Sequence, residues 1–121
     1  MSTAEKTSGG RIEVAPEAIH TIARLSALAV EGVAKVAPVP ADMGRLFRRS
    51  TGHDGVILDF SEGKLRFDVY LHMLPNANVL QTSRRVQAAI VEAMDKMVGL
   101  PVEWVNVHVE DVVYTQETTA S

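Results

Sequence analysis

Valine occupies every second position from Val105 to Val109. A period of two is typical of a β-strand that packs one face against a core, so these valines predict a strand over residues 102–112. The residues between the valines then share the opposite face: Trp104, Asn106, His108 and Glu110. An indole, an amide, an imidazole and a carboxylate do not make an ordinary core layer. This second face is therefore the first candidate for function.

The same alternation occurs along residues 64–73. Its apolar face holds Leu65, Phe67, Val69, Leu71 and Met73, and its other face holds Arg66, Asp68, Tyr70 and His72. Residues 55–60 form a second apolar run, separated from the first by Ser61-Glu62-Gly63. A short loop with a glycine predicts a β-hairpin.

Two segments show helical spacing instead, residues 16–31 and 79–98. Apolar residues recur every three or four positions in both, which predicts one buried stripe on each helix. Pro16 suits a first helical turn, and Asn78 with Gln81 resembles a capping box. Gly32 and Gly99 stand where the two helices should end.

These elements predict an α+β fold, a two-layer sandwich with two helices packed on one face of a small mixed β-sheet. A helix over 79–98 spans about 30 Å, close to the length of a ten-residue strand, so strand, helix and strand form a βαβ unit. We expect residues 11–114 to form a single domain and residues 1–10 and 115–121 to be disordered tails. The expected core contains Ile22, Leu65, Phe67, Val69, Ile90, Val105, Val107 and Val109.

Composition narrows the function classes. The chain of 121 residues has no cysteine, which excludes disulfides, thiol nucleophiles and cysteine-ligated zinc. No segment has the roughly 20 apolar residues of a membrane span, and the start lacks the apolar region of a signal peptide. We therefore expect a cytoplasmic protein. A formal charge of -3 gives no general electrostatic reason to bind nucleic acid.

The chain carries few signs of catalysis. Four histidines are present, His20, His53, His72 and His108, without the spacing of a zinc site such as HExxH. No nucleophile elbow, phosphate-binding loop or dinucleotide fingerprint occurs. We predict a protein that is not an enzyme and has no catalytic residues, cofactor or metal.

The longest irregular connection, residues 41–54, contains an amphipathic run. In a helical turn its apolar residues would align opposite three arginines; the run comprises Met43, Arg45, Leu46, Phe47, Arg48 and Arg49. One interpretation is a loop that folds its apolar side onto its own domain. The other is a binding loop for a membrane-proximal partner or an anionic lipid surface.

The open sheet face also allows more than one interpretation. The candidate interface comprises Ile57, Asp68, Tyr70, His72, Trp104, Asn106, His108 and Glu110. Tyrosine and tryptophan dominate many protein interfaces, so a contact with a second copy or another protein is one hypothesis. In a monomer we expect Ile57, Tyr70 and Trp104 to be in water. A second hypothesis is that these side chains cover one another and form a polar layer that binds no partner. Base stacking by Tyr70 and Trp104 is the third, although the carboxylates on this face would repel phosphates.

With these elements placed, the sequence resembles the alkaline shock protein family of bacterial envelope stress response proteins. The matching segments run from Gly10-Arg11-Ile12 to Ala23, then Val30-Glu31-Gly32-Val33, Gly55-Val56, Gly99-Leu100-Pro101-Val102 and Val105-Asn106-Val107-His108-Val109. Glu110-Asp111 and the arginine-rich loop depart from the family pattern. The resemblance implies a small cytoplasmic, non-enzymatic scaffolding or protein-binding module. It also implies self-association and, for some members, attachment near the membrane through a small membrane protein.

Overall fold

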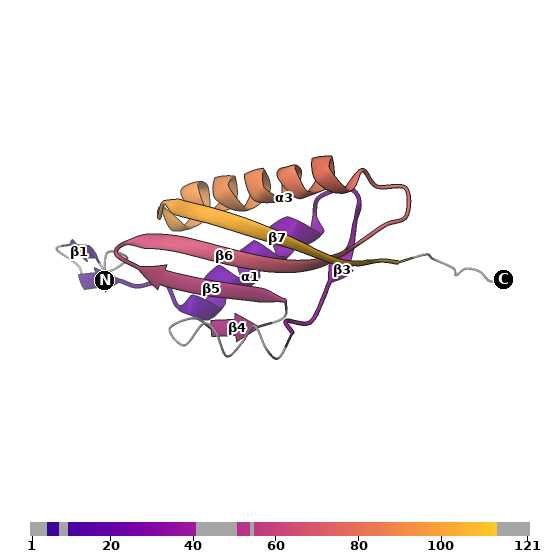
Figure 1. Cartoon of the computed structure of the whole chain (residues 1–121). Coiled ribbons are helices and arrows are strands. Elements are labelled where there is room, and N and C mark those ends of the chain that lie inside the picture. Colours follow the sequence, from indigo (N-terminus) through magenta and orange to yellow (C-terminus); the bar gives the residue numbers. More distant parts are fainter. Residues whose placement is uncertain (1–4, 8–9, 41–50, 54, 114–121) are drawn as a thin grey trace.

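The computed structural model describes residues 5–7, 10–40, 51–53 and 55–113. It is an α+β fold in which a mixed β-sheet is covered on one face by two helices (Figure 1). The elements are β1 (Glu5–Thr7), β2 (Gly10–Ile12), α1 (Pro16–Leu28), β3 (Val33–Val36), β4 (Thr51–His53), β5 (Val56–Ser61), β6 (Lys64–Met73), α3 (Val79–Ala93), the π-helical turn η1 (Met94–Val98) and β7 (Val102–Val112).

Strand β6 is the centre of the main sheet. On one side it pairs in parallel with β7, and on the other it pairs antiparallel with β5 along its first half and with β3 along its last residues. Strand β4 adds to the outer edge of β5. The predicted hairpin is confirmed, since β5 and β6 are joined by Glu62 and Gly63 at positive φ angles of 55° and 75°.

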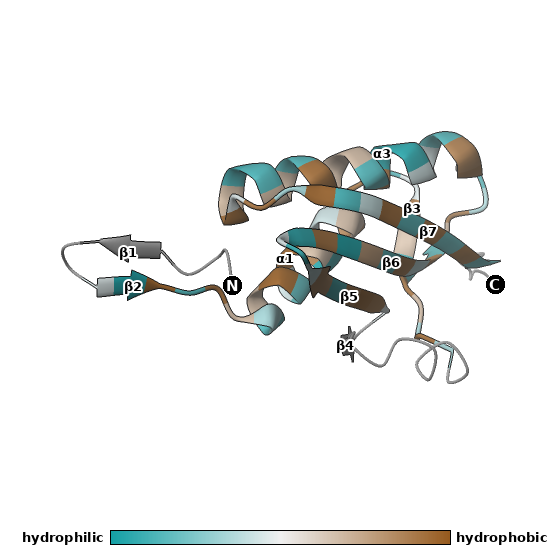
Figure 2. Cartoon of the chain, turned by 60° about the vertical axis from the view of Figure 1, so that its left-hand side comes forward, coloured by the Kyte–Doolittle hydropathy of each residue, from teal (hydrophilic) through white to brown (hydrophobic). Residues whose placement is uncertain are grey.

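The helices lie on the same face of the sheet, as predicted. The buried core joins Ile19, Ala23 and Ala27 of α1 and Val86, Ile90 and Met94 of α3 and η1 to the apolar faces of β5, β6 and β7. Hydrophobic and hydrophilic residues alternate along β6 and β7 (Figure 2). Of the predicted core, Ile22, Val107 and Val109 are only partly buried, and the others are buried.

The helix boundaries follow the capping residues. The Asn78 side chain accepts a hydrogen bond from the backbone N–H of Gln81 at 2.9 Å, which caps the start of α3. The predicted helix 79–98 is a helix that changes to a π-helical turn at Met94 and ends at Gly99, whose φ is 80°. Helix α1 ends at Leu28, three residues before the expected end.

Two short strands differ from the sequence-based expectation. Strand β1, in a segment expected to be a tail, pairs with β2 through the backbone between Glu5 and Ile12. Strand β4 lies in a connection expected to be irregular and pairs Gly52 with Ile57. Backbone pairing needs no apolar side-chain pattern, so neither strand had a periodic signal in the sequence.

Candidate functional site

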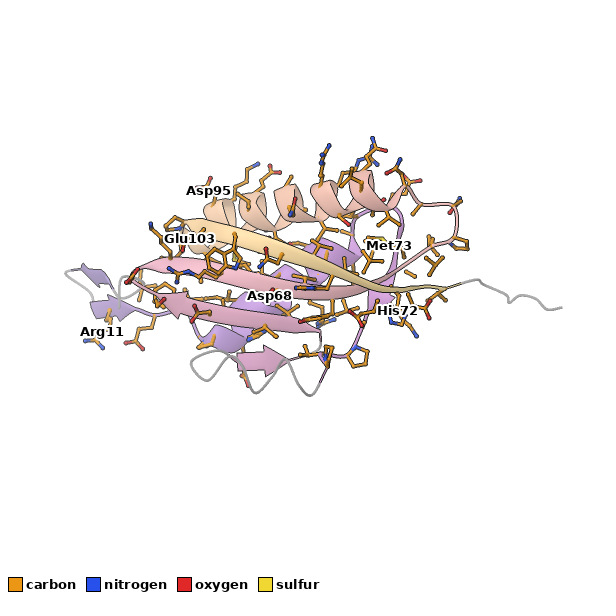
Figure 3. The ribbon with its side chains drawn as sticks, viewed as in Figure 1. Arg11, Asp68, His72, Met73, Asp95 and Glu103 are labelled. Atoms are coloured by element: carbon orange, nitrogen blue, oxygen red, sulfur yellow. The ribbon has the colours of Figure 1, made fainter. Side chains whose placement is uncertain are left out.

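The parallel register of β6 and β7 builds one row of polar side chains on the sheet face that carries no helix. Arg66 pairs with Trp104, Asp68 with Asn106, and Tyr70 with His108. We call this row, together with His72, the polar sheet face. Asp68 lies near its middle and His72 toward one end (Figure 3). The structure therefore brings together the predicted site residues of the two strands.

Asp68 connects the two strands. It is 8% exposed, and its Oδ1 accepts a hydrogen bond from Nδ2 of Asn106 at 3.2 Å. The same oxygen lies 2.9 Å from Nε2 of His108. A carboxylate only accepts hydrogen bonds, so the proton of this bond is on the His108 nitrogen. The buried carboxylate is thus satisfied by two side chains of the neighbouring strand.

Tyr70 lies beside this cluster and is 2% exposed. Its ring stacks on the imidazole of His108, with centroids 4.4 Å apart and planes 12° from parallel. Burial and the nearby carboxylates of Asp68 and Glu110 raise the pKa of the Tyr70 hydroxyl. The hydroxyl is enclosed and has no hydrogen-bond partner among the described residues.

Trp104 is held in place by Arg66. The guanidinium carbon is 5.3 Å from the indole centroid, within range of a cation–π interaction. Arg66 is fixed in turn by Glu103, whose Oε1 lies 2.6 Å from its Nε, and by Asp59 at 3.5 Å. Trp104 nevertheless remains 44% exposed. An oriented aromatic surface therefore faces solvent on the polar sheet face.

The structure corrects one expectation about this face. Ile57 and Tyr70 were expected in water, but both are 2% exposed and form a small apolar cluster with Ala37, against which Val39 packs. After β3 the chain stays beside β6, since the Ala37 N–H donates to the Tyr70 carbonyl at 2.7 Å. Pro38 and Pro40, on either side of Val39, indicated only that β3 ends, and no periodic pattern predicts that this segment covers Tyr70.

The end of β7 also differs from a regular alternation. The pairing with β6 shifts between Leu71 and His72, so that His72 pairs with Asp111 and Glu110 is the extra residue. A second shift near the start of β7 leaves Glu103 unpaired in the ladder and beside Arg66. Sequence reasoning missed Glu103, because strict alternation assigns it to the apolar face with the valines.

Other predicted sites have different outcomes. The amphipathic run from Met43 to Arg49 lies outside the described residues. His20 is buried in α1, on the far side of the sheet from His108.

Among the described residues, no group of three or more His, Asp or Glu side chains is arranged to hold a metal ion. Within the same ranges, neither helix has the length and apolar character needed to cross a bilayer.

Solved structures with a similar fold include variants of the MamM CTD. One has a TM-score of 0.50 and 18% sequence identity, covering 80% of this chain and 95% of that one. Another has a TM-score of 0.51 and 17% identity, covering 82% of this chain and all of that one at 100%. At these identities the likeness describes the arrangement of helices and strands.

Similarity in sequence extends to proteins of two bacteria. The chain is 27% identical to YqhY of Bacillus subtilis over 106 residues, which are 87% of this chain and 78% of that protein. It is 25% identical to Spy1614 of Streptococcus pyogenes over 115 residues, 93% of this chain and 95% of that protein. A family model described by a cell envelope-related function matches residues 4–114, and the chain therefore belongs to the alkaline shock protein 23 family.

Proposed function

We propose that the protein is a non-enzymatic binding module that uses its polar sheet face to contact another protein. The observation that carries this proposal is Trp104, which is 44% exposed although the guanidinium of Arg66 lies over its ring. A tryptophan kept for the chain's own stability would be expected to lie in the core. Tryptophan is also strongly enriched among the residues that dominate protein-interface energies.

The surroundings of Trp104 support a contact surface that is ordered before binding. Arg66 is anchored by Glu103 and Asp59, so the indole loses little further freedom when a partner covers it. Asn106 is exposed beside it and offers an amide for hydrogen bonding. An apolar centre with a polar surround is the usual composition of a protein interface.

The arrangement favours this role over the alternatives. The ring of Tyr70 packs in a buried cluster with Ala37 and stacks on His108. It is therefore not available to stack on a nucleic-acid base. The carboxylates of Glu103 and Glu110 border the same face and oppose a phosphate backbone. The Asp68–His108 pair resembles part of a proton relay, but its hydrogen bonds are used within the polar layer.

The family description supports a location close to the cell envelope. We propose that the protein acts on the cytoplasmic side of the membrane and is held there by a small membrane protein. The run of Arg45, Arg48 and Arg49 is the proposed contact with that partner or with anionic lipid, an argument that rests on the sequence alone. Envelope stress response is the process in which we place this module.

Affinity capture from cells that produce the protein tests the proposal. Tagged wild type is compared with Trp104→Ala and with the matched control Leu25→Ala, which removes an exposed apolar side chain from α1. We expect one or more proteins captured by wild type and the control to be lost with Trp104→Ala. Identical capture by all three would reject the sheet face as the binding surface. Capture of RNA that depends on Trp104 and decreases with salt would favour nucleic-acid binding.

A further inference from the structure

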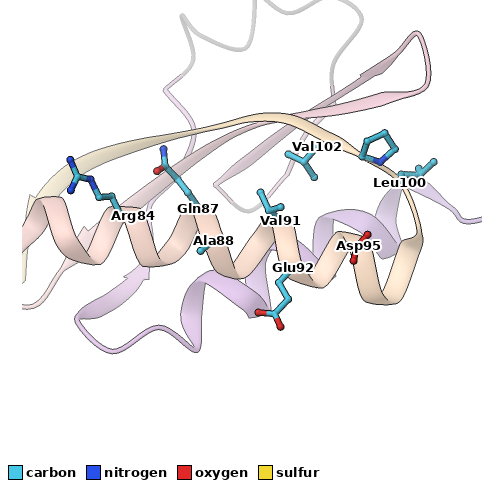
Figure 4. Close-up of a pocket in the computed structure, with 9 residues that line it drawn as sticks. Arg84, Gln87, Ala88, Val91, Glu92, Asp95, Leu100 and Val102 are labelled. Carbon is cyan, nitrogen blue, oxygen red and sulfur yellow. The ribbon is translucent and has the colours of Figure 1, made fainter.

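A groove runs between α3 and the outer edge of β7, away from the polar sheet face. It has a volume of about 610 Å³ and is lined by Arg84, Gln87, Ala88, Val91, Asp95 and, from the other side, Val102. Val91 and Val102 point toward each other across it, with Arg84 toward one end and Asp95 toward the other (Figure 4). The groove therefore has an apolar middle and oppositely charged ends.

The strand that borders this groove has a free edge. Among the described residues, β7 pairs only with β6. One outward backbone group is already satisfied, since Nε2 of Gln87 donates to the carbonyl of Val105 at 2.8 Å. An uncovered edge strand is a site at which another chain readily adds. On α3 the groove is bordered by Val91, which is 43% exposed.

The charges along α3 are arranged for self-complementarity. Arg84 lies one helical turn before Ala88 on α3, and Asp95, in the adjoining turn η1, lies about one turn after Val91. The four positions are therefore symmetric in sequence about the point between Ala89 and Ile90. Within the described ranges neither Arg84 nor Asp95 has an ion-pair partner, whereas Glu92 on the same helix is paired with Lys96 at 2.7 Å. Two charges of opposite sign, neither in an ion pair among the described residues, thus flank a small apolar centre.

We propose that this groove binds a second copy of the same chain, with the two α3 helices antiparallel. A two-fold axis that passes between Ala89 and Ile90 places Arg84 of each copy against Asp95 of the other and Ala88 against Val91. Such a contact is isologous, because the same patch serves both copies and each charge pair forms twice. The dimer covers the free edge of β7 in both copies. It also leaves both polar sheet faces open, so that one dimer presents two binding surfaces.

Charge reversal and restoration test this proposal. Sedimentation equilibrium measures the dimer dissociation constant of wild type, Arg84→Asp, Asp95→Arg and the variant that carries both changes. We expect each single reversal to weaken the dimer about tenfold or more, because two like-charge contacts replace two attractive ones. The double variant, in which the charges are exchanged, should regain most of the affinity. Arg85→Asp is the matched control, since Arg85 is the exposed neighbour outside the groove.

Three results would overturn the proposal. The first is a wild type that remains monomeric up to several hundred micromolar. The second is a dimer whose dissociation constant is the same in wild type and both single reversals. The third is a dimer abolished by Trp104→Ala and insensitive to Arg84→Asp, which would place self-association on the polar sheet face. Circular dichroism of each variant confirms that the fold is retained, which is expected because both charged side chains are exposed.

Discussion

Tyr70 and His108 lie face to face across β6 and β7, with ring centroids 4.4 Å apart and planes inclined by 12°. This stack follows from the parallel pairing of the two strands, which puts the two residues side by side in the ladder. The same register joins Asp68 to Asn106 and Arg66 to Trp104. The register with β6 thus positions three side chains of β7, those of Trp104, Asn106 and His108.

The buried hydroxyl of Tyr70 predicts a loss of stability in alkali. The pKa of Tyr70 is raised in the folded protein, so folding favours the protonated hydroxyl over the ionised form. The stability that depends on this protonation is fully present below the usual tyrosine pKa of about 10. Above that pH the unfolded chain ionises while native Tyr70 keeps its proton, and the free energy of unfolding falls as the pH rises through the native pKa. Tyr70→Phe should flatten this decline, as measured by urea unfolding between pH 8 and pH 11. Parallel curves for the two proteins would contradict the prediction.

The same substitution has an expected effect near neutral pH. Phenylalanine keeps the ring stacked on His108 and removes a buried hydroxyl that has no partner among the described residues. An unsatisfied buried polar group costs about 1–3 kcal/mol, so Tyr70→Phe should leave the free energy of unfolding unchanged or raise it by about 1 kcal/mol. A loss of more than about 1 kcal/mol at pH 7 would show that the hydroxyl makes a favourable interaction.

Asp68→Ala tests the hydrogen-bonded centre of the polar sheet face. The change leaves the side chains of Asn106 and His108 without their shared acceptor. We expect the free energy of unfolding to decrease by about 1–3 kcal/mol, measured by chemical denaturation. Glu13→Ala is the control, because the exposed pair of Glu13 with Arg11 should contribute less than about 0.5 kcal/mol. Equal effects of the two changes would mean that Asp68 has no structural role.

Gly55 and Gly99 have similar backbone angles but different neighbours. Substituting each by alanine therefore separates the cost of a left-handed backbone from the cost of steric overlap. Gly55 has φ 77° and Gly99 has φ 80°. A methyl group at Gly99 meets nothing within 4 Å, whereas one at Gly55 overlaps Val36 and the carbonyl oxygen of Ala37. Gly99→Ala should cost about 1–2 kcal/mol from the left-handed conformation alone. Gly55→Ala should cost at least about 2 kcal/mol more, because β3 and β5 meet there. Similar losses of melting temperature would refute this explanation.

The arginine-rich run predicts weak, reversible membrane attachment. Each basic residue near an anionic bilayer contributes on the order of 1 kcal/mol, and the net charge of -3 opposes binding. We expect partial flotation with anionic vesicles and none with neutral ones. Replacement of Arg45, Arg48 and Arg49 by alanine should abolish it. If binding to both vesicle types is negligible for wild type as well, a direct lipid contact is ruled out. A loop that folds onto its own domain and a contact with a protein partner are then the two remaining interpretations.

Much of the fold could be predicted from the sequence, because strong periodicities mark its long elements. The valine alternation of β7, the stripe of α3 and the Asn78 cap all have local causes, and the family model confirms the resemblance found from these motifs. Strand β4 and the cover over Tyr70 depend on backbone pairing and tertiary contacts, which leave no periodic pattern. The side-chain partners of Asp68 and Arg66 likewise depend on the register, which includes two shifts that alternation does not reveal.

The two proposed surfaces make separate predictions. Trp104 faces the helix-free side of the sheet, and Arg84 and Asp95 border the groove beyond β7. Trp104→Ala should therefore abolish partner capture without changing the dimer dissociation constant. Arg84→Asp should weaken the dimer and leave each polar sheet face able to bind. A single variant that abolished both properties while keeping the fold would show that the two surfaces are coupled.

Site-specific photocrosslinking at position 104 in living cells tests directly whether the polar sheet face contacts another protein. Trp104 is replaced by benzoylphenylalanine, which keeps an aromatic side chain at the same place, and Leu25 on α1 is replaced likewise as the exposed control. We expect irradiation to join position 104 to a discrete second protein, seen as a band of higher mass that is absent with the variant at position 25. No crosslinked protein at position 104, or the same products from both positions, would contradict it.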